Sequence, residues 1–422
     1  MKVIVSPSEV SGEVAAPPSK SMTHRALVLA ALSSGKSIIR NPLESDDTEA
    51  TSRVLTSLGV KVTRGVEWEV EGGHTVAPLG DLYCGESGAT LRFAAAGCGL
   101  VDGHCRLTGG PSLTGRPLGP LLEAIKALGV KSTSRGGYPP VDVEGNGRID
   151  GGQAVMPGNV SSQFISAILL VSPLADSPVE ISVTTPLESK PYVNMTMDAM
   201  RLFGVEVKAS SDMRRFTTTL NPYRAATVGI EGDWSSAALI IAAGVLAGET
   251  RVTGLNRSSS QADRAILDIL ARMGGELTSS SSLIKTDKSR LTGIEHDLSN
   301  CPDLFPVVTA LCASSRGESR LTGLSRLSLK ESDRLDAMVD GLRRMGASIE
   351  ANESEAMING GKLSGAEIDP RRDHRIAMAF TLLALAAEGE TTIKDAECVS
   401  KSYPSFWEDL EGIGAKIRRV SD

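Results

Sequence analysis

The stretch Met345-Gly346-Ala347-Ser348-Ile349 ends an amphipathic run with Met-Gly and then alternates like a strand. The same phrase recurs about every seventy residues, at Leu58-Gly59, Leu128-Gly129, Phe203-Gly204, Met273-Gly274 and Ile413-Gly414. Glycine after the last apolar residue of a helix is the expected stop, because glycine adopts the left-handed backbone without a Cβ penalty. The chain is therefore predicted to contain six copies of one supersecondary unit.

A second phrase lies between the copies of the first and reads as a turn that enters a strand. It occurs at residues 35–39, 103–107, 177–181, 248–252, 317–321 and 389–393. Each copy follows an apolar run rich in small residues, such as residues 26–32, 164–174, 237–246 and 376–386. Runs that are apolar on nearly all sides are typical of helices buried inside a domain. Each unit should therefore contain a buried helix, a strand, an amphipathic helix and a further strand, with room for more strands.

Length and composition indicate the class of protein. A chain of 422 residues is long enough for two large domains, and its six units divide into three plus three. No apolar run reaches the roughly 20 residues of a membrane span. Residues 1–5 read as a strand rather than a signal peptide, so a cytoplasmic protein is expected. A net charge of −7 argues against a nucleic-acid-binding surface.

The chain shows no pattern for a metal or nucleotide cofactor. Its six cysteines lack close paired spacing and are predicted to be free thiols, and its five histidines have no ligand spacing on one helix. Gly35-Lys36-Ser37 follows a helix instead of opening one, so it is not the end of a phosphate-binding loop. Gly145-Asn146-Gly147 lacks the strand-turn-helix context of a dinucleotide site. We expect neither a metal nor a cofactor.

Basic residues gather where helices are expected to begin. These starts span residues 19–25, 115–117, 189–192, 330–334, 373–375 and 401–404. A cation in a first turn is disfavoured by a few tenths to about 1 kcal/mol, because a helix N-terminus carries partial positive charge. Taken singly, each such residue reads as a solvated surface charge. Repetition at six starts favours anion sites instead, since exposed N–H groups and basic side chains bind phosphate and carboxylate together. Polyanionic small molecules are the predicted ligands.

Two acidic residues among the cations are candidates for proton chemistry. Asp303 precedes an apolar run, and Glu331 lies between Lys330 and Arg334. Asp303 reads equally well as a helix cap, and Glu331 as a member of an ion pair. The acids and hydroxyls of residues 45–49 and 232–236 also stand at helix starts, and we interpret them mainly as caps.

Several motifs, in order along nearly the whole chain, closely resemble the EPSP synthase (3-phosphoshikimate 1-carboxyvinyltransferase) family. They are Pro18-Ser19-Lys20-Ser21 with Arg25, Gly88 with Arg92, residues 107–109 with Gly115-Arg116-Pro117, Ser161-Ser162-Gln163-Phe164, Ser189-Lys190-Pro191-Tyr192, residues 330–335, Asp373-His374-Arg375 and Ser400-Lys401-Ser402. The resemblance implies an α/β protein, a two-domain inside-out α/β barrel with three βαβαββ repeats and buried parallel helices in each domain. The expected domains are residues 19–229, and residues 1–18 plus 230–422, with the active site in the cleft between them.

The reaction that the resemblance implies is an addition followed by an elimination. The 5-hydroxyl of shikimate 3-phosphate adds to phosphoenolpyruvate, and the intermediate loses phosphate to give 5-enolpyruvylshikimate 3-phosphate, in the shikimate pathway of aromatic amino acid biosynthesis. The partners are therefore these two small substrates, with no nucleic acid and no membrane, and a monomer is expected. We also expect the domains to close on their ligands, because the basic residues come from both halves of the chain.

The family motifs also imply roles for individual residues. Asp303 is expected to be the base, Glu331 the proton donor to the methylene carbon, and Lys20 an aid to proton transfer. Contacts to shikimate 3-phosphate are expected from Lys20, Ser21, Arg25, Ser161, Ser162, Gln163, Ser189, Asp303 and Lys330. Contacts to phosphoenolpyruvate are expected from Lys20, Gly88, Arg116, Gln163, Arg334, Arg375 and Lys401.

Four positions depart from common forms of the family. Glu86, Ala89 and Phe93 surround Gly88 where Asn, Thr and Pro are frequent, and Arg326 stands where some members have Asn. Two rival functions remain. One is a UDP-N-acetylglucosamine carboxyvinyltransferase, whose members usually carry a cysteine in the loop that here is residues 109–114 and has none. The other is a non-catalytic binder of phosphorylated metabolites, which would have no need of two acids among the cations.

Overall fold

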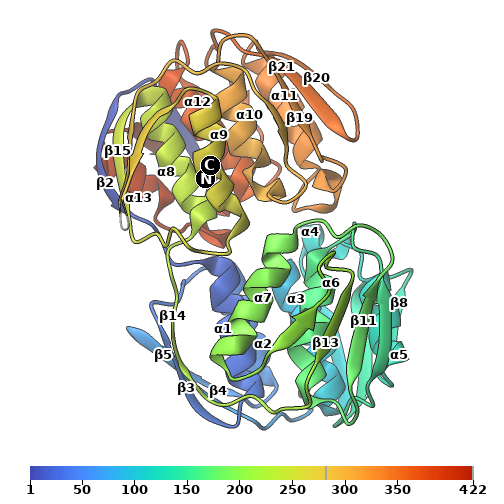
Figure 1. Cartoon of the computed structure of the whole chain (residues 1–422). Helices are drawn as coiled ribbons and strands as arrows, with labels where there is room; N and C mark the ends of the chain where they lie inside the picture. Colours follow the sequence, from blue (N-terminus) through green and yellow to red (C-terminus); the bar gives the residue numbers. More distant parts are fainter. Residues whose placement is uncertain (281–282, 421–422) are drawn as a thin grey trace. The chain divides into compact units, whose positions relative to one another are not determined.

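The computed structural model describes residues 1–280 and 283–420, and it divides into two compact units (Figure 1). Unit 1 contains Met1–Pro17 and the chain from Glu231 onward, and unit 2 is Pro18–Ile230. The chain therefore passes from one unit to the other at two points. That each unit is also a domain in the functional sense stays a prediction.

Unit 2 is built from helices and four-stranded sheets. Its α-helices are α1 (Lys20–Leu32), α2 (Asp46–Ser57), α3 (Gly88–Gly97), α4 (Pro111–Thr114), α5 (Gly119–Ala127), α6 (Ser162–Val171) and α7 (Lys190–Leu202). Its sheets have the strand orders β14 (Thr227–Gly229), β3 (Gly35–Arg40), β5 (Glu67–Gly72), β4 (Lys61–Thr63); then β6 (Leu82–Tyr83), β7 (Asp102–Thr108), β9 (Tyr138–Asn146), β8 (Lys131–Arg135); and β10 (Gly152–Met156), β11 (Val179–Val183), β13 (Arg215–Thr218), β12 (Val207–Ala209).

Unit 1 repeats the same plan. Its α-helices are α8 (Trp234–Ala247), α9 (Ile266–Arg272), α10 (Phe305–Ala313), α11 (Arg334–Arg344), α12 (His374–Ala386) and α13 (Phe406–Gly412). Its sheets have the strand orders β2 (Val10–Ala15), β15 (Gly248–Thr253), β17 (Leu283–Asp287), β16 (Glu276–Ser279); then β18 (Glu295–Asp297), β19 (Glu318–Thr322), β21 (Glu355–Asn359), β20 (Ser348–Ala351); and β22 (Glu367–Ile368), β23 (Thr391–Ile393), β1 (Lys2–Ser6), β24 (Lys416–Val420).

All six sheets formed by the described residues share one pairing pattern. The strand that follows each buried helix pairs in parallel with an edge strand and antiparallel with the third strand, as β7 does with β6 and β9. The order β6, α3, β7, α5, β8, β9 is thus a βαβαββ repeat. This confirms both the unit predicted from the two recurring phrases and the βαβαββ repeat that the family resemblance implies.

Three strands complete repeats to which they are not adjacent in sequence. The N-terminal strand β1 supplies the last strand of the sixth repeat by pairing with β23 and β24. Strand β2 pairs in parallel with β15, beside which it lies in Figure 1. Strand β14, at the end of unit 2, pairs with β3 at its beginning. Each unit is closed in this way by strands from distant parts of the chain.

The six phrases in which a glycine follows a large apolar residue end helices as predicted. Each amphipathic helix has its C-cap at the residue before the glycine, for example Leu128 in α5 and Met345 in α11. The glycines that follow all have left-handed backbones, with φ of 88° at Gly59, 91° at Gly129, 84° at Gly204, 82° at Gly274, 86° at Gly346 and 105° at Gly414. The amphipathic helices therefore stop by the same glycine mechanism in every repeat.

The apolar runs form the helices of the core. Every residue of α10 is buried, as is every residue of α8 except Ser235. In α6 all residues but Gln163 are buried, and that residue stands in the first turn. Apolar side chains on all faces let such a helix pack against neighbours on every side, which accounts for the lack of a polar stripe.

Two of the predicted helix starts are wrong. Lys401 ends the 3-10 helix η6 (Ala396–Lys401), and the next helix, α13, begins at Phe406. Arg116 stands before Gly119, where α5 begins, and follows the short helix α4. Pro117 and Pro404 suggested helix starts because proline favours a first turn, but both lie in the connections that precede the helices.

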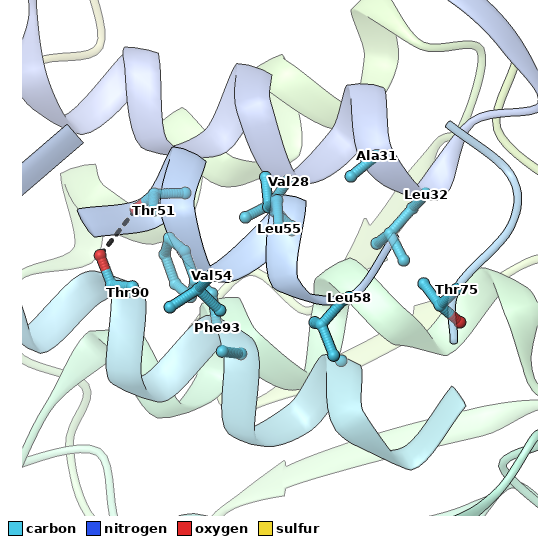
Figure 2. A pocket seen from close by; sticks show the side chains of 12 residues that line it. Val28, Ala31, Leu32, Thr51, Val54, Leu55, Leu58, Thr75, Thr90 and Phe93 are labelled. Atoms are coloured by element: carbon cyan, nitrogen blue, oxygen red, sulfur yellow. Dashed lines mark hydrogen bonds between the residues drawn. The ribbon is translucent and has the colours of Figure 1, made fainter. Parts of the chain in front are cut away.

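A small cavity lies between α1, α2 and α3 of unit 2 (Figure 2). Its volume is about 40 Å³, and apolar side chains such as Val28, Leu55 and Phe93 line it. The hydroxyls of Thr51 and Thr90 are hydrogen-bonded to each other at 2.6 Å at one end of it. Gly97 borders the cavity, and a Cβ atom at this glycine would meet no atom within 4 Å.

We expect Gly97→Ala to stabilise the protein by about 1 kcal/mol, because alanine favours the helix and fills empty space. Gly341→Ala in α11 is the matched contrast, since its Cβ would lie 2.2 Å from Cζ of Phe380. That overpacking should destabilise by about 1–3 kcal/mol. Urea unfolding of the two variants measures both effects. If both substitutions raised the free energy of unfolding, or both lowered it, this account of the packing would be contradicted.

Among the described residues, no helix has both the length and the apolar character required to cross a membrane. All six cysteines are free, and all but Cys398 are buried.

Candidate active site

Asp303 lies at the centre of a group of charged side chains in unit 1. It belongs to the 3-10 helix η4 (Pro302–Leu304), directly before α10. One carboxylate oxygen accepts hydrogen bonds from Lys330 Nζ at 3.1 Å and Arg334 Nη1 at 2.8 Å. The other oxygen accepts from Arg375 Nη2 at 3.1 Å. The N-cap positions of η4 and α10 are Cys301 and Leu304, so Asp303 does not stand at the N-cap position of either helix.

The cations around Asp303 control its acidity. Burial alone would raise the pKa of this carboxyl, but Arg375, Lys330 and Arg334 together hold the pKa well below its usual value. Burial in turn lowers the pKa of Lys330 to about 8, although Asp303 opposes that shift. An anionic ligand that draws Lys330 and Arg375 away would make Asp303 a stronger base.

Glu331 is the second acid of this group. Its carboxylate accepts a hydrogen bond of 2.6 Å from Arg334 Nη2, and Lys401 Nζ lies 3.7 Å from its other oxygen. The interpretation of Glu331 as a member of an ion pair is therefore confirmed, with Arg334 and Lys401 as partners. A carboxylate formed here on loss of a proton would be stabilised by the same two cations.

Arg334 joins the acids together. It is the first residue of α11, whose N-cap Asp333 accepts a hydrogen bond from Asp336 N, and its side chain is 1% exposed. Besides Asp303 and Glu331, it contacts Asp373 through Nε at 2.8 Å. Asp373 caps α12 by accepting from the backbone N–H of Arg375. Arginine suits this position because its planar guanidinium donates in several fixed directions.

Taken together, the unit 1 cluster places four cations against three carboxylates. Its members are Lys330, Arg334, Arg375 and Lys401 with Asp303, Glu331 and Asp373. Sequence reasoning missed Asp373 because an aspartate at a helix start looks like an ordinary cap. Its place two residues before the arginine of the Asp-His-Arg motif is the signal that could have revealed it. Arg326 is also buried; it donates to Ser299 O at 2.7 Å, and its charge adds to the lowering of the pKa of Lys330 that burial causes.

In unit 2, Lys20 stands at the first position of α1 and pairs with Asp47. Its Nζ lies 2.9 Å from Asp47 Oδ2. The cap of α2 is Ser45, which forms a reciprocal capping box with Thr48. Ser45 is thus a cap as predicted, as is Asp233 at α8, whereas Asp47 instead partners Lys20. The acid compensates a cation that both the dipole of α1 and burial disfavour.

Two arginines meet at the start of α3. A Cβ atom on Gly88 would lie 2.5 Å from Arg116 Nη1 and 3.0 Å from Arg92 Nη1, so a larger residue here would displace the Arg116 guanidinium from its present place. Arg92 also donates to Gln163 Oε1 at 2.6 Å. Sequence reasoning gave Arg92 no role, although the Gly88 and Arg92 motif contained it. Buried arginines beside the N-terminus of a helix form a favourable environment for phosphate or carboxylate.

Arg25 connects the start of α1 to that of α7. It donates to Thr196 Oγ1 at 2.8 Å, to Tyr192 O at 3.0 Å and to Ser21 O at 2.9 Å. Burial lowers its pKa to about 10, which still leaves the guanidinium charged at neutral pH. These hydrogen bonds go to protein groups, and one acceptor, Tyr192, lies three residues after Ser189 in the chain.

Side-chain contacts join the first two turns of five helices of unit 2 into a closed ring. The pairs are Lys20 with Asp47 (α1 and α2), Thr51 with Thr90 (α2 and α3), Arg92 with Gln163 (α3 and α6), Ser166 with Thr196 (α6 and α7) and Thr196 with Arg25 (α7 and α1). The N-terminal ends of these helices consequently lie together, and their partial positive charges add. The predicted serines occupy the same end: Ser161 caps α6, Ser162 begins it, and Ser189 precedes α7 with a left-handed φ of 55°.

Comparison with known proteins gives one consistent family. Residues 4–410 match the family model described as EPSP synthase (3-phosphoshikimate 1-carboxyvinyltransferase). The chain is 41% identical over 421 residues to 3-phosphoshikimate 1-carboxyvinyltransferase of Dehalococcoides mccartyi, covering 99% of each chain. It is also 41% identical over 423 residues to the enzyme of that name from Methanocorpusculum labreanum, covering 99% of this chain and 100% of that one.

A solved structure supports the same likeness. The EPSP synthase of Acinetobacter baumannii superposes with a TM-score of 0.83 at 26% identity, and all of both chains is covered.

Proposed function

The chain belongs to the EPSP synthase family, and from this premise we propose which of its residues bind and which react. The reaction transfers the 1-carboxyvinyl group of phosphoenolpyruvate to the 5-hydroxyl of shikimate 3-phosphate and releases phosphate. We propose that the unit 1 cluster and the helix starts of unit 2 face one another across a single cleft when both substrates bind. The observation that carries the proposal is that one buried arginine, Arg334, holds both Asp303 and Glu331.

Asp303 is proposed as the base that accepts the proton of the 5-hydroxyl. In the free protein its cations hold its pKa low, which would make it a weak base. The phosphate of shikimate 3-phosphate at Lys330, and the carboxylate of phosphoenolpyruvate at Arg375, would compete for these cations. Binding of both substrates would therefore raise the basicity of Asp303 at the moment when a proton must be accepted.

Glu331 is proposed as the acid that protonates the methylene carbon. In the addition, the hydroxyl oxygen bonds to C2 of phosphoenolpyruvate while the methylene becomes a methyl group. In the elimination, Glu331 takes a proton back from that methyl group as the bond between C2 and the phosphate oxygen breaks. Arg334 and Lys401 lie against this carboxylate and would stabilise its ionised form between the two steps.

The remaining roles follow the family motifs. We propose that Lys20, Gly88, Arg116, Gln163, Arg334, Arg375 and Lys401 contact phosphoenolpyruvate, and that Lys20, Ser21, Arg25, Ser161, Ser162, Gln163, Ser189, Asp303 and Lys330 contact shikimate 3-phosphate. The buried guanidinium groups of Arg116 and Arg92 at Gly88 support the first set. The ring of helix N-termini in unit 2 supports the second. A monomer in the cytoplasm and closure of the two units on ligand complete the proposal.

The rival acceptor provides the test. Phosphate release should require phosphoenolpyruvate together with shikimate 3-phosphate, and each substrate alone should give none. Release with UDP-N-acetylglucosamine as the acceptor, or no release with either acceptor, would contradict the proposed function. The same assay separates a catalyst from a protein that only binds phosphorylated metabolites, since binding alone releases no phosphate.

A further inference from the structure

Glu86 holds together two loops of unit 2 at the proposed phosphoenolpyruvate site. It lies between β6 and α3, two residues before Gly88. One of its carboxylate oxygens accepts a hydrogen bond of 2.6 Å from Ser112 Oγ and another of 3.0 Å from the backbone N–H of Leu113. Both donors belong to the short helix α4. The contact therefore connects segments that are more than twenty residues apart.

The geometry of this contact is that of a helix cap supplied from elsewhere in the chain. The N-cap of α4 is Gly110, which has no side chain with which to cap it. Leu113 is the third residue of α4. The backbone N–H at that position is a usual donor to the oxygen of an N-cap side chain. Glu86 provides that oxygen. The negative charge also suits the positive end of the helix.

The two loops fit closely around this cap. Gly110 N donates to Gly85 O at 2.8 Å. A Cβ atom on Gly110 would lie 2.1 Å from Glu86 Oε1, and one on Gly109 would lie 2.9 Å from Gly85 O. These glycines allow the loop of residues 109–115 to lie directly against Gly85 and Glu86.

Arg116 follows this loop at once. Its backbone N–H donates to Leu113 O at 3.1 Å, so its main chain is tied to the residue that Glu86 holds. Its guanidinium lies against Gly88, only two residues from Glu86 in sequence. The segment from residue 112 to Arg116 thus joins the Glu86 cap to the Arg116 guanidinium at the start of α3.

We propose that Glu86 is a positioning residue, which caps α4 and thereby fixes Arg116 in the place where it binds phosphoenolpyruvate. The inference rests on the proposed function, because it takes Arg116 as a contact to that substrate. Without the cap, the 109–115 loop gains freedom, and each binding event must order it again. The loss should fall on phosphoenolpyruvate and leave shikimate 3-phosphate largely unaffected.

Glu86→Ala and Glu86→Gln separate the hydrogen bond from the charge. The alanine variant is expected to raise KM for phosphoenolpyruvate at least about tenfold, equivalent to roughly 1.4 kcal/mol, with KM for shikimate 3-phosphate changed less than about threefold. The glutamine variant keeps an oxygen that accepts from Leu113 N–H, so its KM for phosphoenolpyruvate should stay within about threefold of wild type. Glu123→Ala, which removes an exposed glutamate of α5 paired with Lys126, is the matched control and should change neither constant.

Three further measurements test whether Glu86 positions Arg116. Ser112→Ala removes one of the two donors and should raise KM for phosphoenolpyruvate by an intermediate factor, which keeps the test informative if Glu86→Ala does not fold. Hydrogen exchange should become faster in residues 109–116 of Glu86→Ala. An unchanged KM for phosphoenolpyruvate in Glu86→Ala, or equal increases in the alanine and glutamine variants, would overturn the proposal. Arg116→Ala tests the premise separately, since an unchanged KM there would remove Arg116 from the substrate site.

Discussion

Asp303→Asn is expected to reduce kcat by about 10²–10⁴, the usual contribution of a general base. Asparagine has nearly the same shape and keeps one oxygen that accepts hydrogen bonds from Lys330, Arg334 or Arg375. It has no basic carboxylate to accept the proton of the hydroxyl. Binding of both substrates should therefore be largely retained while turnover is lost, which steady-state kinetics together with calorimetric titration measures.

Asp340→Asn is the control for this substitution. Asp340 is an exposed carboxylate of unit 1 that pairs with Arg344 at 3.0 Å. The same chemical change there should leave kcat unaltered. If Asp303→Asn kept kcat within about threefold of wild type, Asp303 would not be the base.

Arg334→Met should be the most destabilising single substitution at the site. It leaves Asp303, Glu331 and Asp373 without the buried cation that now donates to each of them at 2.6–2.8 Å. Removing one partner of a buried ion pair costs about 3–5 kcal/mol. Arg344→Met on the same helix removes an arginine that is 52% exposed, and it should cost no more than about 0.5 kcal/mol. Urea unfolding at pH 7 compares the two variants.

The loss in Arg334→Met should depend on pH in a defined direction. In the wild type, burial alone would raise the pKa of Asp303. The cations around it outweigh burial and hold the folded-state pKa below the unfolded value. The stabilisation is thus present above about pH 4, the unfolded pKa, and is lost as the pH falls through the folded pKa. Without Arg334 the carboxyls are more readily protonated, so the difference between variant and wild type should shrink from pH 7 to pH 4.5. A constant difference would indicate lost packing rather than lost charge compensation.

The local elements of the fold were predictable because their signals are local. A glycine after an apolar residue ends a helix through its own backbone, so the phrases at Gly129 and Gly346 showed where helices stop. The pairing of β1 with β23 and β24 was not readable from the strands themselves. Any of the alternating segments has the pattern for such a partnership, and only the family resemblance assigned the first strand to the last part of the chain.

The site was predictable where a motif contains the residue and not where contacts between helices create it. Lys20, Asp303 and Glu331 stand in recognisable phrases. Asp47 becomes the partner of Lys20 only because α1 and α2 pack side by side. The sequence around Asp47 looks like an ordinary helix start. Glu86 stood out only as a departure from the family pattern, since its role depends on a loop more than twenty residues away.

The addition and elimination proposed for Asp303 and Glu331 have one direct chemical consequence. If the methylene carbon of phosphoenolpyruvate becomes a methyl group and then loses a proton, the carbon exchanges hydrogen with acidic groups that have equilibrated with solvent. The decisive measurement is the mass spectrum of the product formed in D2O from phosphoenolpyruvate and shikimate 3-phosphate. The account predicts that the product carries deuterium in the methylene of its enolpyruvyl group. It also predicts that one phosphate is released for each molecule of product. A product that carries no deuterium after partial conversion would contradict it.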